Sequence, residues 1–332
     1  MNILITSVSR KVSLVNAFRQ ALYEEGGGQV IAIDASPRSA ALYFADKAYI
    51  VPAGLDKEFL KTVQDICIKH EIKLIIPTRD EELPFFAENR KSLEDVGACV
   101  MVSGLDAIRL CQDKALFIEF CLKHGLSVPK TYKHADLFDF PVFVKSRFGK
   151  GSKGTFRANS KSELDCLLSC LKDPIVQEYI EAPEYTVDLF ADFSGKVISA
   201  VPRERLTIFG GESFIGRTCK NWNIIYESIR LVEVLNLIGH NTIQCFLHNG
   251  QVKFIEVNPR YGGAANLSFA AGAFTPRMLV RLVSGKEVKP CVGEFRDNLY
   301  MLRYTEDIFV DEDKMKGIKY FAESNLSQRS LS

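Results

Sequence analysis

Apolar runs and helical apolar stripes alternate along roughly the first 105 residues of the chain. Short apolar runs predict strands, and apolar residues spaced three or four apart predict helices. The predicted strands cover residues 2–6, 30–33, 74–76 and 98–102, and the predicted helices cover 11–23, 56–69 and a segment from about 81. Because strands that alternate with helices favour βαβ units, this region predicts a small doubly wound parallel sheet.

The pattern changes at Gln112, where Asp113-Lys114 opens an amphipathic helix that ends at Gly125. Two units of mixed helix and strand follow. The first has predicted strands at 142–145, 155–157 and 175–179 and a helix at 162–171. The second has strands around 185–193 and 196–201, a helix near 223–237 and a hairpin over 242–257. The chain is therefore expected to be an α/β protein with a second, two-part domain.

Charge and composition exclude several classes of partner. The 332 residues contain 42 Lys plus Arg and 41 Asp plus Glu, so no field of one sign attracts nucleic acid or an anionic membrane surface. No window approaches the roughly 20 apolar residues that span a bilayer. The chain enters an apolar run at Ile3 without a basic leader, and its nine cysteines form no C-x-x-C pair. We expect a cytoplasmic protein with reduced thiols.

The N-terminal region invites comparison with a dinucleotide-binding site. Asp34 ends the second strand, where a ribose-binding acid would lie, but the loop over residues 6–11 contains no glycine. Its backbone cannot approach a pyrophosphate closely, which argues against nicotinamide or flavin binding. Ser7, Ser9 and Arg10 either hold a substrate anion or form a solvated loop. Similarly, the acids at 80–82 either receive an ammonium group or complement a helix dipole.

The glycine-rich segment at 149–154 matches G-x-G-x-x-G, yet a strand follows it instead of a helix. This order favours a flap whose backbone amides close over phosphates, with an ordinary glycine hairpin as the alternative. Lys145 ends the strand before the flap, and Lys114 opens the preceding helix. Two ammonium groups in these places can pair with phosphate oxygens.

Residues 176–184 combine a strand with a Glu-Ala-Pro-Glu turn. Such a segment can present a carbonyl and an amide to an adenine edge and leave Glu184 for ribose hydroxyls. An edge strand that ends in a turn is the alternative. Arg203 and Arg205 are two apart on a predicted strand, so both guanidinium groups either reach one transferring phosphoryl group or form a solvated basic edge.

The strongest local signal is the segment 254–260, which contains Glu-Val-Asn-Pro-Arg. Because strand side chains alternate, Glu256 and Asn258 face one way, toward a hard cation such as Mg²⁺, while Ile255 and Val257 face the other. A structural bridge from Glu256 to Arg260 is the alternative. A two-residue turn at Asn249-Gly250 would place Gln244 on the opposite face from Glu256. A metal site that includes Gln244 therefore predicts an odd-length loop.

These pieces, in this order, resemble the ATP-grasp superfamily, in particular the branch with carbamoyl phosphate synthetase large subunits and biotin carboxylase. The likeness covers about residues 1–290 and rests on the Asp-Lys helix, the flap, the paired arginines and the Asn-Pro-Arg signature. It implies a Rossmann-like pre-ATP-grasp domain over 1–110 and a two-lobed α+β ATP-grasp domain over 111–290. The lid would cover about 130–183 and the core about 184–290, with a C-terminal extension at 291–332.

The resemblance also implies roles for individual residues. ATP phosphates would contact Lys114, Lys145 and the lid residues Gly149, Gly151, Ser152 and Gly154, while adenine would meet the main chain of Glu178 and Ile180 and ribose would meet Glu184. The metal ligands would be Gln244, Glu256 and Asn258, for Mg²⁺ or alternatively Mn²⁺. Arg260 would act on the γ-phosphate and acyl phosphate, and the charge that develops would be held by Arg203 and Arg205.

The expected function is that of an ATP-dependent carboxylate–amine ligase that works through an acyl phosphate. The chain has room for one ATP-grasp module, whereas the large subunits of carbamoyl phosphate synthetase contain two, and we locate no biotin site. Its partners would be small carboxylate and amine substrates, and a homodimer is compatible with this interpretation. The rival hypotheses are a non-catalytic nucleotide-binding scaffold and a dinucleotide-dependent oxidoreductase.

Overall fold

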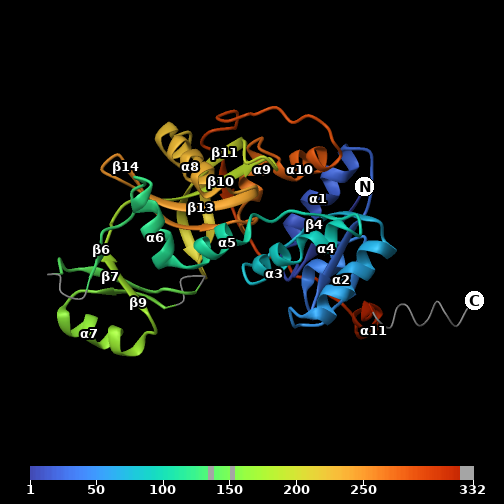
Figure 1. The fold of residues 1–332 in the computed structure, drawn as a ribbon, viewed down its shortest axis with the longest axis horizontal. Coiled ribbons are helices and arrows are strands. Elements are labelled where there is room, and N and C mark those ends of the chain that lie inside the picture. The colour runs from blue at the N-terminus through green and yellow to red at the C-terminus, as the bar shows by residue number, and fades with distance from the viewer. Residues whose placement is uncertain (134–137, 150–153, 322–332) are drawn as a thin grey trace, which may run out of the picture.

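The computed structural model describes residues 1–133, 138–149 and 154–321, which form three β-sheets (Figure 1). The first sheet is parallel, with strand order β3-β2-β1-β4-β5. Its strands are β1 (Asn2–Thr6), β2 (Val30–Asp34), β3 (Lys47–Ile50), β4 (Ile72–Ile76) and β5 (Cys99–Val100). The predicted doubly wound sheet is confirmed, although β3 was not predicted.

Helices cover both faces of the parallel sheet. Ile3 and Ile5 of β1 pack in one apolar cluster with Phe18, whereas Leu4 packs in another with Phe59. This alternation explains why the strands read as continuous apolar runs. The helices of this region are α1 (Val12–Glu24), η1 (Ala40–Phe44), α2 (Lys57–Lys69), α3 (Glu82–Glu88), α4 (Arg90–Glu94) and α5 (Leu105–Gln112).

The second sheet has six strands in the order β14-β13-β10-β11-β12-β15, each antiparallel to its neighbours. One of its faces packs through Val187 and Ile243 on apolar residues of α6 and α8. Its strands are β10 (Glu184–Ala191), β11 (Val197–Phe209), β12 (Glu212–Thr218), β13 (Gly239–His248), β14 (Gln251–Asn258) and β15 (Tyr300–Leu302). The helices around it are α6 (Lys114–Lys123), α8 (Trp222–Leu235), α9 (Asn266–Ala270) and α10 (Thr275–Val283).

The third sheet is a small antiparallel unit in the order β6-β9-β7-β8, at the opposite end of the molecule from the parallel sheet (Figure 1). It has its own apolar cluster, in which Val144 and Val176 of the sheet pack with Leu164 of α7. Its elements are β6 (Thr131–Tyr132), β7 (Val142–Ser146), β8 (Thr155–Ala158), α7 (Lys161–Cys170) and β9 (Pro174–Glu178). The predicted α/β class, with a parallel first sheet and a two-part second region, is confirmed.

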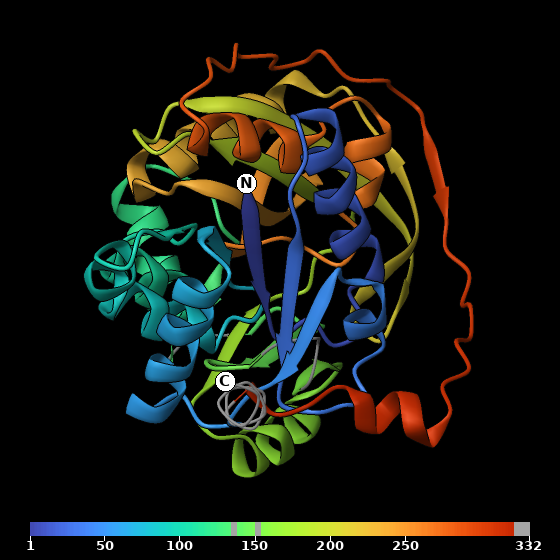
Figure 2. The ribbon, with the colours of Figure 1, turned by 90° about the vertical axis from the view of Figure 1, so that its right-hand side faces the viewer.

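The C-terminal segment runs along one side of the molecule from the six-stranded sheet to the parallel sheet (Figure 2). It contributes β15 to the first of these, and after α11 (Glu312–Gly317) Tyr320 forms a parallel bridge with Ile50 of β3. Phe321 packs edge-on against Tyr49, with ring centroids 5.1 Å apart. The segment predicted as an extension over 291–332 thus adds a strand to the second sheet; the domain boundaries themselves stay a prediction.

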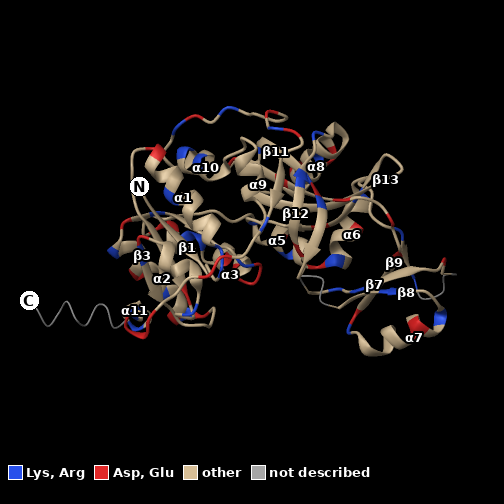
Figure 3. Ribbon diagram, turned by 180° about the vertical axis from the view of Figure 1, so that it is seen from behind, with Lys and Arg blue, Asp and Glu red and all other residues tan. Residues whose placement is uncertain are grey.

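Acidic and basic residues are interspersed over the described ribbon (Figure 3). This distribution agrees with the near balance of 42 basic and 41 acidic residues in the sequence. Among the helices of the described ranges, none has the length and hydropathy that a bilayer crossing requires.

Candidate functional site

A cavity of about 660 Å³ lies between the six-stranded sheet and the small antiparallel sheet. Its size falls in the range of small-molecule sites. Both sheets contribute predicted residues to its lining: Lys114, Lys145, Gly149, Glu178, Ile180, Glu184, Arg203, Arg205, Gln244, Glu256, Asn258 and Arg260. Gly151 and Ser152 lie outside the described residues. Residues separated by up to 146 positions in the sequence therefore meet at one site, although their individual roles stay predictions.

Two ammonium groups reach the cavity, Lys145 from β7 of the small sheet and Lys114 from the start of α6. Lys145 on β7 is only 3% exposed, and burial lowers its pKa to about 8, an effect that nearby Lys114 increases and Glu256 opposes. Lys114 donates from Nζ to the carbonyl of Gly149 over 2.7 Å and so contacts the start of the glycine-rich segment. The carbonyl of Gly154, at the other end of that segment, accepts from the Ser146 amide. Among the described residues no carboxylate lies within 4.0 Å of this buried ammonium group, and the cost of burying it favours an anionic ligand beside Lys145.

The acid and amide of β14 lie on the opposite wall. Asn258 donates from Nδ2 to Oε1 of Glu256 over 3.1 Å, so the two side chains share one face of the strand as predicted. Gln244 is the direct cross-strand partner of Glu256. These three residues offer only oxygen ligands with one carboxylate, which fits Mg²⁺, an ion that keeps water and phosphate oxygens in its shell.

The prediction of an odd-length hairpin loop between Gln244 and Glu256 was wrong. The hairpin closes with a two-residue turn, Asn249-Gly250, in which both residues have positive φ (51° and 77°). A bulge instead restores the register: Cys245 pairs with Phe254 and Gln244 with Glu256, leaving Ile255 without a partner. Ile255 consequently lines the cavity, and the prediction that it faces away with Val257 was also wrong.

Arg203 and Arg205 on β11 both line the cavity, as their spacing predicted. Arg203 is 1% exposed and makes a double hydrogen bond to Asp188 of β10, over 2.7 and 3.0 Å. Its Nη1 is buried and has no protein partner among the described residues. Arg205 donates from Nη1 to Glu184 and, over 3.1 Å, to Gln244.

Glu178 and Glu184, predicted to contact adenine and ribose, already have protein partners. Glu184, predicted for ribose, forms an ion pair with Arg205; burial raises the pKa of its carboxyl, and the arginine opposes that rise. Glu178 accepts from Nζ of Lys253 over 2.5 Å, and its amide donates to the carbonyl of Lys130 over 2.9 Å. A nucleotide that uses Glu184 has to compete with Arg205 for its carboxylate.

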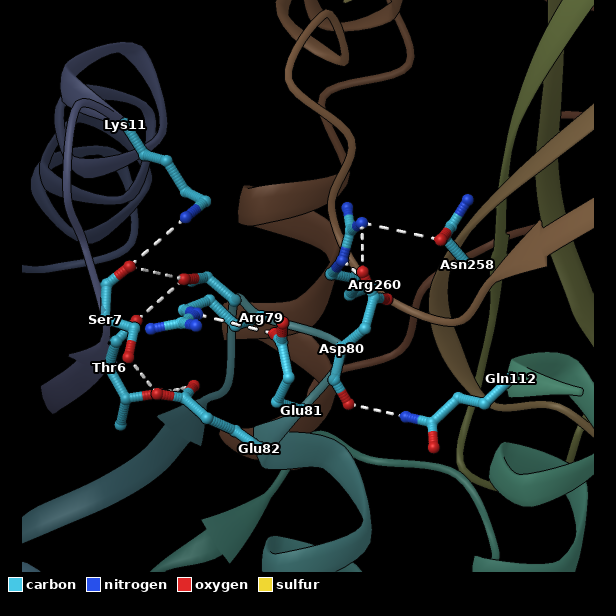
Figure 4. Close-up of polar contacts among 11 residues, drawn as sticks. Thr6, Ser7, Lys11, Arg79, Asp80, Glu81, Glu82, Gln112, Asn258 and Arg260 are labelled. Atoms are coloured by element: carbon cyan, nitrogen blue, oxygen red, sulfur yellow. Dashed lines mark hydrogen bonds and ion pairs between the residues drawn. The ribbon is translucent and has the colours of Figure 1, made fainter. Parts of the chain in front are cut away.

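Two acids hold the arginines of the site, a role that the sequence predicted for neither of them. Asp80, near the end of the loop before α3, makes a double hydrogen bond to Arg260 over 2.8 and 2.5 Å (Figure 4). Asp188 is 1% exposed and holds Arg203; burial alone would raise its pKa, but Arg203 and His240 lower it. Asp188 follows Glu184 and Thr186 at two-residue spacing, and an acid in that row of an apolar strand is the signal that was overlooked.

Comparison with known proteins agrees with this geometry. Two family models match: "PylC-like, N-terminal domain" over residues 3–102, and "ATP-grasp in the biosynthetic pathway with Ter operon" over residues 171–306. Carbamoyl phosphate synthase large chain of Thermoplasma acidophilum is 25% identical over 293 residues, which are 79% of this chain and 28% of that protein. The chain thus spans little more than a quarter of the length of this relative.

Solved structures share the fold. The biotin carboxylase domain of Hydrogenobacter thermophilus 2-oxoglutarate carboxylase, in complex with MgADP and bicarbonate, superposes with a TM-score of 0.69 at 18% identity, covering 90% of this chain and 73% of that one. L-amino acid ligase of Bacillus licheniformis gives 0.69 at 16% identity, covering 89% and 77%. The chain combines a PylC-like N-terminal domain with an ATP-grasp domain.

Proposed function

We propose that this chain is an ATP-dependent carboxylate–amine ligase that activates its carboxylate substrate as an acyl phosphate. The observation that carries the proposal is the cavity between two sheets, with Lys145 on one wall and Glu256 and Asn258 on the other. The ligases and carboxylases among the similar proteins support it, including one whose structure was solved with MgADP and bicarbonate. The substrates and the whole activity are inferred, since the chain covers only part of its curated relatives.

In the proposed reaction ATP lies in the cavity with its phosphates between the two walls. Lys114 and Lys145 would bind phosphate oxygens as point charges, and the segment that starts at Gly149 would exclude water. Glu178 and Ile180 would offer main-chain groups to adenine, and Glu184 would bind ribose. Mg²⁺, held by Glu256, Asn258 and Gln244, would neutralise charge on the β- and γ-phosphates.

A carboxylate oxygen of the substrate would then attack the γ-phosphorus. The new O–P bond forms as the bond between the γ-phosphorus and its bridging oxygen breaks, and ADP leaves. The amine substrate next attacks the acyl carbon, phosphate leaves with the electron pair of the C–O bond, and the amine releases a proton to solvent. Arg203, Arg205 and Arg260 would stabilise the charge that develops, each contributing about 3 kcal/mol.

Hydroxylamine trapping tests this function without knowledge of the amine substrate. Hydroxylamine converts an acyl phosphate to a hydroxamate, so the protein with Mg-ATP, hydroxylamine and a panel of carboxylates is expected to form ADP and hydroxamate together. Glu256→Gln should reduce both products at least about 100-fold, whereas Glu233→Gln, an exposed acid of α8, should leave them unchanged.

The outcomes separate the proposal from its rivals. Nucleotide binding without ADP or hydroxamate from any carboxylate would support a non-catalytic scaffold. Preference for NAD(P) over ATP in direct binding would favour an oxidoreductase. The cytoplasmic location and a homodimer also stay proposals, the latter measurable by light scattering.

A further inference from the structure

A second polar cluster lies at the carboxyl edge of the parallel sheet, beside Arg260 (Figure 4). Thr6 ends β1 and Ser7 follows it, while Lys11 immediately precedes α1 and Glu82 opens α3. Lys11 is electrostatically coupled to both Arg260 and Glu82. The cluster therefore adjoins the arginine that the proposed function places at the reacting groups.

Glu82 is an unusually buried acid, with only 4% of its surface exposed. Its carboxylate accepts from Oγ1 of Thr6 over 2.7 Å and from the hydroxyl of Ser7, and burial raises its pKa. Thr78 donates to the carbonyls of Thr6 and Ser7 over 2.7 and 2.9 Å, which fixes this arrangement. Across the described part of the chain, no Lys or Arg nitrogen lies within 4.0 Å of this carboxylate.

Lys11 presents the opposite charge in the same place. Its Nζ donates to the carbonyl of Ser7 over 3.1 Å, so Ser7 contacts both Lys11 and Glu82. Burial, together with the neighbouring Arg260, lowers the pKa of Lys11 to about 8, although Glu82 and Asp34 oppose the change. No carboxylate oxygen of the described residues lies within 4.0 Å of this ammonium group.

The other charged side chains of the loop between β4 and α3 are paired. Arg79 lies 3.4 Å from Glu81, and Asp80 binds Arg260 with two hydrogen bonds (Figure 4). Asp80 also presents its carbonyl to Nε2 of Gln112 over 2.5 Å, which anchors the loop to α5. Among the described residues, Lys11 and Glu82 are thus the two charged groups of the cluster without an ion pair within 4.0 Å, and only the more distant Asp34 and Arg79 balance them electrostatically.

We propose that this cluster binds the head group of an α-amino acid, with its ammonium group on Glu82 and its carboxylate between Lys11 and Arg260. That carboxylate would be the one that is phosphorylated, so the inference rests on the proposed function and names its substrate class. One small molecule then supplies both missing charges. Bicarbonate or a simple carboxylate would match Lys11 alone and leave the buried Glu82 without a cation.

Substrate discrimination in the wild-type protein is the first test. The assay measures ADP and hydroxamate with Mg-ATP, hydroxylamine and the standard amino acids, each compared with its analogue that lacks the amino group, such as alanine with propionate and glutamate with glutarate. At least one amino acid should exceed its analogue by about 100-fold or more in kcat/KM, because the analogue leaves Glu82 unmatched.

Two nearly isosteric variants then assign the roles. Glu82→Gln should raise KM for the amino acid at least about 10-fold and reduce the preference over the analogue, with KM for ATP unchanged. Lys11→Met should lower kcat/KM for both the amino acid and the analogue by a similar factor. Glu94→Gln and Lys57→Met replace exposed residues of the same domain and should change neither constant. Melting temperatures check that each variant is folded.

The two proposals fail in different ways. If carboxylates without an amino group give more hydroxamate than every amino acid, the proposed substrate class is wrong and the ligase function stands. Retained discrimination in folded Glu82→Gln would overturn the role of Glu82. Absence of ADP formation with all substrates would remove the ligase function and the inference together.

Discussion

The parallel sheet and the six-stranded antiparallel sheet carry charge in different places. In the parallel sheet β1 is apolar on both faces, because helices cover both, and its polar groups gather at the carboxyl edge, at Thr6 and Ser7. In the antiparallel sheet one face is apolar and the other lines the cavity with charged residues such as Arg203 and Glu256. A sheet that is covered on both faces can place chemistry only at its edge, whereas an open face can carry it along several strands.

One ion pair connects the carboxyl edge of the parallel sheet with the charged face of the antiparallel sheet. Asp80 comes from the edge of the parallel sheet, and Arg260 follows the last strand of the antiparallel hairpin. The side chains are 17% and 18% exposed, so the pair is partly shielded from water. This contact joins the proposed amino-acid site to the proposed phosphoryl-transfer site, and the comparison between the sheets can be tested on each side of it.

The largest loss of stability is expected from replacing Asp188, the acid buried within the charged face of the antiparallel sheet. Asp188→Asn leaves the Arg203 guanidinium buried without its carboxylate, which should cost about 3–5 kcal/mol of unfolding free energy. Asp165→Asn, which breaks the exposed Lys161–Asp165 pair on α7, should cost less than about 0.5 kcal/mol. Urea unfolding of both variants measures the difference. Equal, small losses would show that the charged face is not the buried network described above.

Replacing Lys145, on the other wall of the same cavity, tests the proposed binding of ATP phosphates. Lys145→Met removes the ammonium group of a residue that is 3% exposed and lines the cavity where we propose the phosphates bind, and it should lower ATP turnover about 100- to 1,000-fold. Lys161→Met on the outside of α7 should leave turnover unchanged. Phosphate release and the melting temperature are measured for both. A folded Lys145→Met protein with wild-type turnover would contradict the placement of phosphates beside β7.

The sequence predicted the parallel sheet better than the antiparallel one, and the cause is physical. Strands covered on both faces appear as uninterrupted apolar runs, so β1, β2 and β4 could be identified directly. By contrast, β3 and β12 contain exposed or half-exposed residues and a polar composition, which hides them. Their positions depend on pairing with distant strands and not on their own pattern.

The site was predictable where side-chain spacing alone decides the geometry. Glu256 and Asn258 share a face because they are two apart, and the same holds for Arg203 and Arg205. The bulge at Ile255 was not predictable, because a local sequence does not reveal an unpaired residue in a ladder. The contact of Asp80 with Arg260 joins residues 180 positions apart, and only the assembled fold brings them together.

A smaller loss of stability is expected from breaking the contact between α1, which covers the parallel sheet, and α10, which lies beside the antiparallel sheet. Glu25, just after α1, is 4% exposed and pairs with Arg277, Arg281 and Lys286 around α10. Hydrogen bonds from Arg277 and Lys286 lower its pKa to about 2. Glu25→Gln should cost about 1–2 kcal/mol near neutral pH. Glu24→Gln should cost clearly less, because the ion pair of Glu24 with Arg277 is longer, at 3.5 Å, and its other contact is a hydrogen bond from the neutral Gln20.

The pH dependence of this contact has a definite sign. Because the pKa of Glu25 is depressed in the folded protein, its stabilisation is complete above the ordinary value of 4.5 and is lost as pH falls toward about 2. The stability difference between wild type and Glu25→Gln should therefore narrow as pH falls through this window. Denaturant unfolding at several pH values measures it, and a difference that stays constant with pH would exclude ionised Glu25 as the source.

The smallest effect on stability is expected at the Asn249-Gly250 turn, which joins β13 and β14, the strands of the proposed metal site. Gly250 has a φ of 77° in open space, with no atom within 4 Å of an added Cβ, so Gly250→Ala should cost about 1 kcal/mol through backbone strain alone. Gly317→Ala also meets open space, without a positive φ, and should be neutral or slightly stabilising. Because the bulge at Ile255, and not the turn, sets Gln244 opposite Glu256, turnover of the folded Gly250→Ala protein should be unchanged. A large loss of turnover with little loss of stability would instead show that the turn controls the register.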